Sequence, residues 1–320
     1  MDIQQQESTK ASGQGNDPRS LLDFWQPRYW PTWIGLACLR LVGCLPTAAQ
    51  LALGRHLGRV AYRLAPGRRR IAARNLELCF PELSATDRDR LVRRHFESLG
   101  MTLVEHGLAW WAPDAWMHER VELVGVQHLR DALATGRGIV LLTGHFGSQE
   151  VTGRVVRAEI PEFGALYRPS KNPFVDELLK RIRSRSASMM IPKQSMRRMI
   201  RALRQGIPVW YAPDQSQRRS FSSLVPFFGE PAMTTTALSE IVRLGNAVVV
   251  PLLPRRFPET GRYTLEVLPA LEDFPGPSPE ADAARVNALL EAHIRKAPEQ
   301  YYWIHRRFKG RPPPYPDPYA

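Results

Sequence analysis

Cysteine is scarce in this sequence, and the familiar metal-binding patterns are missing. The 320 residues contain three cysteines, Cys38, Cys44 and Cys79. This odd number gives no disulfide framework and no CxxC pair, which is typical of a protein kept in a reducing compartment. The eight histidines form no HxH, HExxH or Cys-His cluster, so we expect no metal site.

Signatures of covalent nucleophiles and nucleotide cofactors are also missing. No GxSxG elbow occurs, and Ser148 has the wrong neighbours for one. Neither a P-loop nor a GxGxxG fingerprint is present. We therefore expect an activity without a cofactor, in which the protein's own side chains carry out the chemistry.

Acidic residues are too few to balance the basic ones. The chain has 44 Lys and Arg against 31 Asp and Glu, with a pI of about 10.1. Such a surplus predicts a polyanionic partner, namely nucleic acid, an anionic membrane or an acidic carrier protein. The basic residues lack interleaved aromatic stacking positions, and no nucleic-acid motif is found. This argues against nucleic acid.

The N-terminal segments differ from the rest in composition. Residues 1–27 are predicted to be a disordered tail, since 1–17 are polar and rich in Gln, Ser and Gly and lack a secretory-signal pattern. Residues 28–55 are predicted to be a membrane-anchoring helix, since they are largely apolar and begin with tryptophans. Arg40, Pro46 and Gln50 interrupt this run, so an amphipathic helix packed on the domain is the alternative.

The remaining chain is predicted to be one α/β domain, residues 56–311, followed by a Pro-rich tail, residues 312–320. Short apolar runs alternate with helical patterns, which favours a single domain with a central, largely parallel sheet flanked by helices. Tyr263–Leu268 alternates in the manner of an edge strand. With 43% hydrophobic residues, the chain has ample material for a core.

Gly138–Glu150 (GIVLLTGHFGSQE) is the stretch on which a chemical function can be based. Its apolar start is typical of a buried parallel strand, and a helix can follow from Ser148. His145 would then lie at the carboxyl edge of the sheet, where open α/β folds bind ligands. Glu150 could hold one imidazole nitrogen and leave the other as a general base. The His-x4-acid spacing alone is weak, with roughly one chance match expected.

Lys193–Arg204 projects as a basic amphipathic helix. Its Lys and Arg residues fall in one sector and its Met, Ile and Leu residues in the opposite one. An ordinary surface helix with a solvated basic face is the alternative to a binding site.

Beyond these local patterns, a series of motifs resembles the lipid A biosynthesis acyltransferases of the glycerolipid acyltransferase superfamily. The motifs are, in order, NLELCFPELS, ESLGMTLVE, TGHFGSQE, YRPSKNP with RIRSRS, VWYAPDQS, VPFFGEPAMTTTALS and PEQYYWIHRRFK. They cover nearly the whole chain from Tyr29 to about Arg311. The first and last motifs point to the lauroyl-type branch.

The resemblance implies an acyltransferase that moves a lauroyl chain from acyl carrier protein to a hydroxyl of the Kdo-bearing tetraacyl lipid A precursor. His145 would be the general base and Glu150 its orienting carboxylate, with no covalent intermediate. It also implies a bacterial inner-membrane location with the catalytic domain on the cytoplasmic side.

Two further residues are assigned to substrate binding. Arg168, in the YRP motif, would hold phosphate or stabilise the active site, and a structural ion pair is the alternative. Asp214, in APDQS, follows a strand at the expected ligand edge, and capping of the strand end is the alternative. Arg181, Arg183 and Arg185 would face phosphates or the acidic carrier, unless they are merely solvated.

Two rival functions remain open at the level of sequence. One is an acyltransferase for another membrane glycolipid, such as a mannosylated phosphatidylinositol. The other is a non-enzymatic basic protein that binds membrane or nucleic acid. The HRRFK ending and the outer motifs argue against the first, and the lack of interleaved aromatic residues and of a nucleic-acid motif argues against the second.

Overall fold

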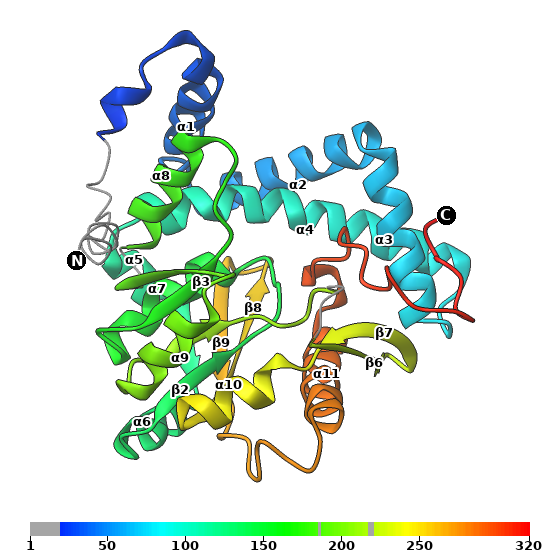
Figure 1. The fold of residues 1–320 in the computed structure, drawn as a ribbon. Coiled ribbons are helices and arrows are strands. Elements are labelled where there is room, and N and C mark those ends of the chain that lie inside the picture. The colour runs from blue at the N-terminus through cyan, green and yellow to red at the C-terminus, as the bar shows by residue number, and fades with distance from the viewer. Residues whose placement is uncertain (1–19, 185–186, 217–220) are drawn as a thin grey trace, which may run out of the picture.

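A computed structural model of the chain describes residues 20–184, 187–216 and 221–320. The tail predicted for residues 1–27 falls mostly outside these ranges, as does Arg185. In the described residues, seven strands form one sheet in the order β1-β9-β8-β2-β5-β3-β4 (Figure 1). The strands are β1 Val121–Val124, β2 Gly138–Leu142, β3 Gly164–Tyr167, β4 Met189–Pro192, β5 Val209–Tyr211, β8 Ala247–Phe257 and β9 Arg262–Val267.

Five neighbouring strands of this sheet, from β8 to β4, are parallel. β9 runs antiparallel to β8, and β1 pairs parallel with β9. The predicted α/β fold with a largely parallel sheet is confirmed. The prediction of an edge strand at Tyr263–Leu268 is wrong, because β9 lies between β1 and β8. It alternates because alternate residues of β9 are buried and the residues between them are partly or fully exposed.

β2 lies at the centre of the sheet. All five of its residues, GIVLL, are buried, as expected of a strand covered by helices on both faces. Helices α6 (Val126–Ala134) and α7 (Gln149–Glu159) cover one face, where Ile139 and Leu141 pack. Helices α9 (Met196–Arg204), α10 (Ala237–Gly245) and α11 (Pro279–Lys296) cover the other.

The remaining elements complete the domain around this core. They are the hairpin β6 Ser222–Phe227 with β7 Glu230–Thr235, the helices α3 Pro66–Cys79, α4 Ala85–Trp111, α5 Asp114–Arg120 and α8 Pro173–Arg183, and the short 3₁₀ turns η1 Leu21–Phe24, η2 Pro27–Tyr29 and η3 Pro298–Gln300. Ser84 caps the start of α4, because its hydroxyl accepts a hydrogen bond from the Asp87 amide at 3.1 Å.

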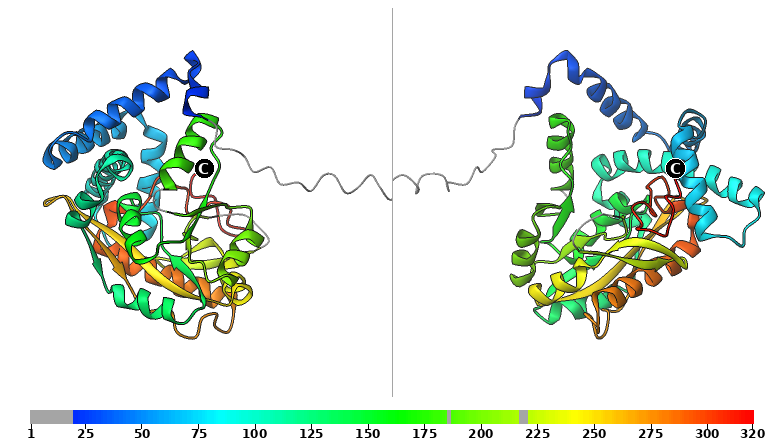
Figure 2. Two further views of the ribbon diagram at one scale, coloured as in Figure 1. Left: turned by 90° about the vertical axis from the view of Figure 1, so that its left-hand side faces the viewer. Right: turned by 45° about the vertical axis from the view of Figure 1, so that its right-hand side comes forward.

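The N-terminal segment is not the single helix expected over residues 28–55. The chain forms α1 (Trp30–Val42) and α2 (Thr47–Leu64). The break between them ends at Pro46, which has an extended backbone and is the residue before the second helix. Both lie along one side of the molecule, apart from the sheet (Figures 1 and 2). No helix among the described residues combines the length and apolar character needed to cross a membrane. The predicted membrane-anchoring helix is therefore unsupported.

α2 belongs instead to the packed domain. Gly54 and Gly58 on α2 face Gly100 on α4 so closely that a Cβ atom at any of the three would overlap the opposite backbone. Part of the apolar stretch predicted to contact the membrane therefore packs against α4, and this close helix–helix contact requires glycine. This packing is the alternative that Arg40, Pro46 and Gln50 had left open.

Candidate active site

His145 and Asp214 meet at the carboxyl ends of two adjacent strands. In the parallel register, Leu142 on β2 lies beside Tyr211 on β5, and the two site residues each follow three positions later. The Asp214 carboxylate accepts a hydrogen bond from the His145 amide at 2.9 Å and contacts the ring Nδ1 at 2.6 Å. The imidazole is therefore fixed in position, and its Nε2 remains the nitrogen available to a substrate.

Residues close to the C-terminus hold the histidine loop from behind. The Tyr302 amide donates to the His145 carbonyl at 3.1 Å, and the Gly147 amide donates to the Gln300 carbonyl at 3.1 Å. The Tyr301 hydroxyl lies against Asp214 and stabilises its ionised form. The PEQYYW sequence therefore supports the loop that carries His145.

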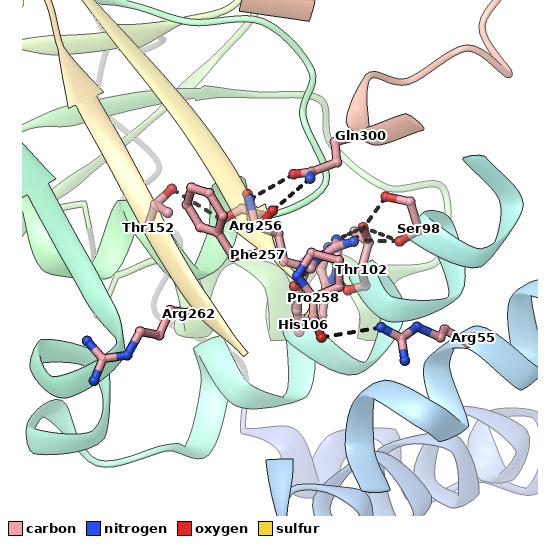
Figure 3. A network of polar contacts seen from close by, with 12 residues as sticks. Arg55, Ser98, Thr102, His106, Thr152, Arg256, Phe257, Pro258, Arg262 and Gln300 are labelled. Carbon is pink, nitrogen blue, oxygen red and sulfur yellow. Dashed lines mark hydrogen bonds and ion pairs between the residues drawn. The ribbon is translucent and has the colours of Figure 1, made fainter. Parts of the chain in front are cut away.

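A buried ionic network lies behind the same loop. Arg256 on β8 pairs with Glu105 on α4 and donates to the Ser98 and Thr102 hydroxyls at 3.0 Å each (Figure 3). The Gln300 amide exchanges two 2.8 Å hydrogen bonds with the Arg256 backbone. Because three of these residues lie in ESLGMTLVE and one in PEQYYW, the network explains why both motifs carry polar residues.

The charges at the site oppose the effect of burial. Burial lowers the pKa of His145, but the charge and hydrogen bond of Asp214 outweigh it and leave the pKa above its usual 6.5. Burial raises the pKa of Asp214, but His145 and Tyr301 lower it to about 2. Asp214 is therefore ionised at neutral pH, and it supports protonation of the imidazole.

Glu150 has a different partner from the one expected. It lies in the first turn of α7 and forms an ion pair with Arg183 at the end of α8. Burial raises the pKa of Glu150, but the charges of Arg183 and His106 outweigh burial and keep it below its usual value. The expected hydrogen bond from Glu150 to His145 is not formed. The long-range register of two strands, which the local spacing cannot reveal, places Asp214 there instead.

A cavity of about 1250 Å³ opens beside His145. His145, Glu150 and Arg168 line it, with Arg183 and Lys193 also at its wall. Arg168 follows β3 and is exposed, with no hydrogen bond or ion pair to any residue that the structure describes. The ion pair considered as an alternative for Arg168 is thus not present in this part of the chain. Asp214 lies behind His145 and is only 2% exposed.

The structure thus brings the four predicted site residues to one edge of the sheet, at the ends of β2, β5 and β3. Tyr301 and the direct contact between His145 and Asp214 were missed. In the sequence, His145 and Asp214 each stand three residues after the end of an apolar run. This equal distance predicts their contact only when the two runs are known to be neighbouring strands. Among the described residues, no group of three or more metal-ligating side chains is found.

An imidazole backed by a buried carboxylate, at the mouth of a cavity with cationic and apolar walls, defines a site for proton abstraction from an anionic amphiphile. The family model of bacterial lipid A biosynthesis acyltransferases matches residues 19–310. The chain belongs to this family and is an acyltransferase of lipid A biosynthesis.

The chain aligns with its relatives over nearly the full length of both sequences. The chain is 42% identical over 305 residues to the lipid A biosynthesis lauroyltransferase of Escherichia coli K12, spanning 95% of this chain and 99% of that protein. It is 40% identical over 291 residues to the palmitoleoyltransferase of the same strain, spanning 91% and 94%. Identity to the myristoyltransferase is 28% over 313 residues, spanning 97% of both chains.

Proposed function

We propose that this enzyme transfers a lauroyl chain from acyl carrier protein to a hydroxyl group on an acyl chain of the Kdo-bearing tetraacyl lipid A precursor. The observation that carries the proposal is the His145–Asp214 pair at the mouth of a large cavity, in a chain of this family. Identity is 42% to a lauroyltransferase, 40% to a palmitoleoyltransferase and 28% to a myristoyltransferase, which favours the first two chain types over the third.

In the proposed reaction, Nε2 of His145 removes the proton of the acceptor hydroxyl. The oxygen attacks the thioester carbonyl, and the carbon–sulfur bond breaks as the tetrahedral intermediate collapses. The thiolate of the carrier protein leaves and takes the proton from the imidazolium. Asp214 stabilises that imidazolium and fixes the ring, because its charge raises the pKa of His145. No covalent acyl-enzyme is needed.

Glu150 is proposed to act in the site through Arg183. Its ionised carboxylate holds the guanidinium at the cavity wall. Arg168, just after β3, and Arg183, the last residue of α8, then present positive charge to the phosphate groups of the acceptor. Guanidinium groups suit such contacts because they can bind phosphate in a bidentate manner.

Contact with the inner membrane from the cytoplasmic side is proposed to involve η1 and α1. Several large apolar side chains there are exposed, including Trp25 at 71%, Trp30 at 50% and Ile34 at 61%. Exposed aromatic and aliphatic side chains next to basic residues are typical of helices that lie in a membrane interface. Arg28 and Arg40 provide the adjacent positive charge.

The test is incubation of the purified enzyme with acyl carrier protein thioesters and the lipid A precursor, followed by mass spectrometry. We expect the acceptor to gain one lauroyl chain. If the acceptor gained no mass with any thioester tested, the proposal would be rejected. Transfer to a different glycolipid, with none to the lipid A precursor, would reject the acceptor alone.

A further inference from the structure

The site cavity is lined from both faces of the sheet, at the edge where two strands end their pairing. β3 and β5 are paired only at Gly164–Val209 and Ala165–Trp210, whereas β3 continues to pair with β4 for two more residues. Beyond Trp210 the two strands therefore separate, at the edge where His145 lies. The cavity occupies this split, because residues from both faces of both strands line it.

Side-chain alternation shows the two faces directly. Successive residues of a strand point to opposite sides. Ala165 and Trp210 pack in the core under α6 and α7, whereas Leu166 and Tyr211 pack toward α9 and α10. All four line the one cavity. The cavity therefore has two arms, one on each face of the sheet.

The arm under α7 ends among buried side chains. Besides Ala165 and Trp210, its wall includes Gly153, Phe163 and Ala187. Phe163 and Ala187 are each 2% exposed, and Phe163 precedes β3, at the far end of the strand from His145. We call these five residues the closed arm. It follows the four residues of β3, a depth of roughly 13 Å at 3.3 Å per residue.

The arm beside α9 and α10 reaches the surface. Its wall includes Met196, Ile241 and Leu244, together with Phe221. Phe221 is 61% exposed and Leu244 36%. We call these residues, with Leu166 and Tyr211, the open arm. An open, wider apolar surface places no limit on the length of a chain that lies in it.

We propose that the two arms bind two different acyl chains, with the donor chain in the closed arm and the hydroxyacyl chain of the acceptor in the open arm. This inference rests on the proposed acyl transfer. A closed apolar arm discriminates chains by length, because each additional methylene must either be buried or meet the floor. The donor has one chain, whereas the acceptor has several and needs an opening for the others. His145, at the split, lies where the two chains meet.

Gly153→Leu is the test of the closed arm. A Cβ at Gly153 would only touch the Trp210 ring, at 4.0 Å, and leucine is a better helix former than glycine. The variant should fold and shorten the arm. With saturated acyl carrier protein thioesters stepped by two carbons, we expect kcat/KM for the wild-type optimum to fall about tenfold or more. Shorter donors should lose less, so the preferred length decreases.

Ala237→Leu is the matched control in the open arm, since Ala237 begins α10 and lines that side of the cavity. We expect a higher KM for the acceptor and the wild-type order of donor lengths. An unchanged order in Gly153→Leu, or a shortened preference in Ala237→Leu, would overturn the assignment of the arms.

A binding measurement separates this proposal from the proposed reaction. Saturated fatty acids of stepped lengths can be titrated against a fluorescent fatty acid on the wild type and both variants. Loss of the longer fatty acids in Gly153→Leu alone would support the closed arm even if no acyl transfer were detected. Equal displacement profiles in all three proteins would reject it even if transfer occurred.

Discussion

Two ionic pairs lie within the same part of the molecule, and they differ in how far each is buried. The Arg256 and Glu105 side chains are 0% and 2% exposed, and the guanidinium is further bonded to Ser98 and Thr102. In the second pair, the side chain of Asp214 is 1% exposed but the side chain of His145 is 37% exposed. The first pair is closed on all sides, whereas the second has one nitrogen directed away from its partner.

This difference in burial distinguishes a pair that stabilises the structure from a pair that can take part in a reaction. A fully buried pair with every donor satisfied contributes rigidity, although it contributes little net stability. A pair with one open side can exchange a proton with a bound molecule. The two are linked, because Thr102 and Arg256 would both collide with a Cβ at Gly147, in the histidine loop. The closed pair thus determines where the reactive pair lies.

The largest effect on activity is expected from His145→Ala, which removes the base. General-base catalysis contributes about 10²–10⁴-fold, so kcat in the mass-spectrometric assay should fall by that factor. Fatty-acid binding and the circular dichroism spectrum should persist. Near-normal turnover would show that the imidazole is not the base.

The largest effect on stability is expected from Arg256→Met. It leaves the Glu105 carboxylate buried without its partner, which costs about 3–5 kcal/mol. Urea denaturation would measure the loss. The matched double variant Arg256→Met with Glu105→Leu should recover most of it. If the single and double variants are equally unstable, the charge on Glu105 is not the cause.

Asp214→Asn should alter the reactive pair without removing it. The free enzyme needs neutral His145, so kcat/KM falls on the acid side around a pKa above 6.5. Without the carboxylate, burial and the charges of Arg183 and Lys193 lower that pKa. We expect about a 10²-fold loss of rate, with the acid limb of the profile displaced to lower pH. An acid limb that stays in place would argue against Asp214 as the orienting group.

Glu150→Gln distinguishes the expected partner of Glu150 from the observed one. If Glu150 acts through Arg183, the variant should raise KM for the acceptor about tenfold, as expected for loss of a charged hydrogen bond. Arg183→Gln should have the same effect, and the pH profile should not move. A displaced acid limb in Glu150→Gln would restore the direct role on His145 predicted from the sequence.

The smallest effect on stability is expected at the surface pair Arg59–Glu97. Its Nε and Oε1 atoms are 2.6 Å apart, and the two side chains are 60% and 24% exposed. Arg59→Ala should lower the free energy of unfolding by less than about 1 kcal/mol, and by less still in high salt. Activity should be unchanged. A loss comparable to that of Arg256→Met would remove burial as the explanation of the contrast between the pairs.

Local patterns predicted the strands that lie in the middle of the sheet. β2, β3 and β5 are short apolar runs ended by polar residues, and a strand buried on both faces leaves that pattern. The hairpin of β6 and β7 was missed. Its second strand, Glu230–Thr235, ends in threonines immediately before α10. The hairpin forms through pairing with β6, which no single segment reveals.

The site was predictable in its members but not in its contacts. His145 and Asp214 follow apolar runs whose ends meet at one sheet edge. Glu150 was assigned from its spacing to His145, and Arg168 from the resemblance of its YRP motif to that of the lipid A biosynthesis acyltransferases. Which carboxylate meets the imidazole depends on strand order and register, and β5 becomes the neighbour of β2 only after two strands are placed further out. The single helix predicted for residues 28–55 was wrong for a related reason, because its second half belongs to α2, which packs on α4 through glycines.

The separation of β3 from β5 also opens part of β3 toward the cavity. Past Ala165 and Trp210 the two strands no longer pair with each other, whereas Tyr211 keeps its pairing with β2. An alkyl chain in the split would exclude water from the last residues of β3. Slower amide hydrogen exchange there would then report an occupied cavity without any turnover.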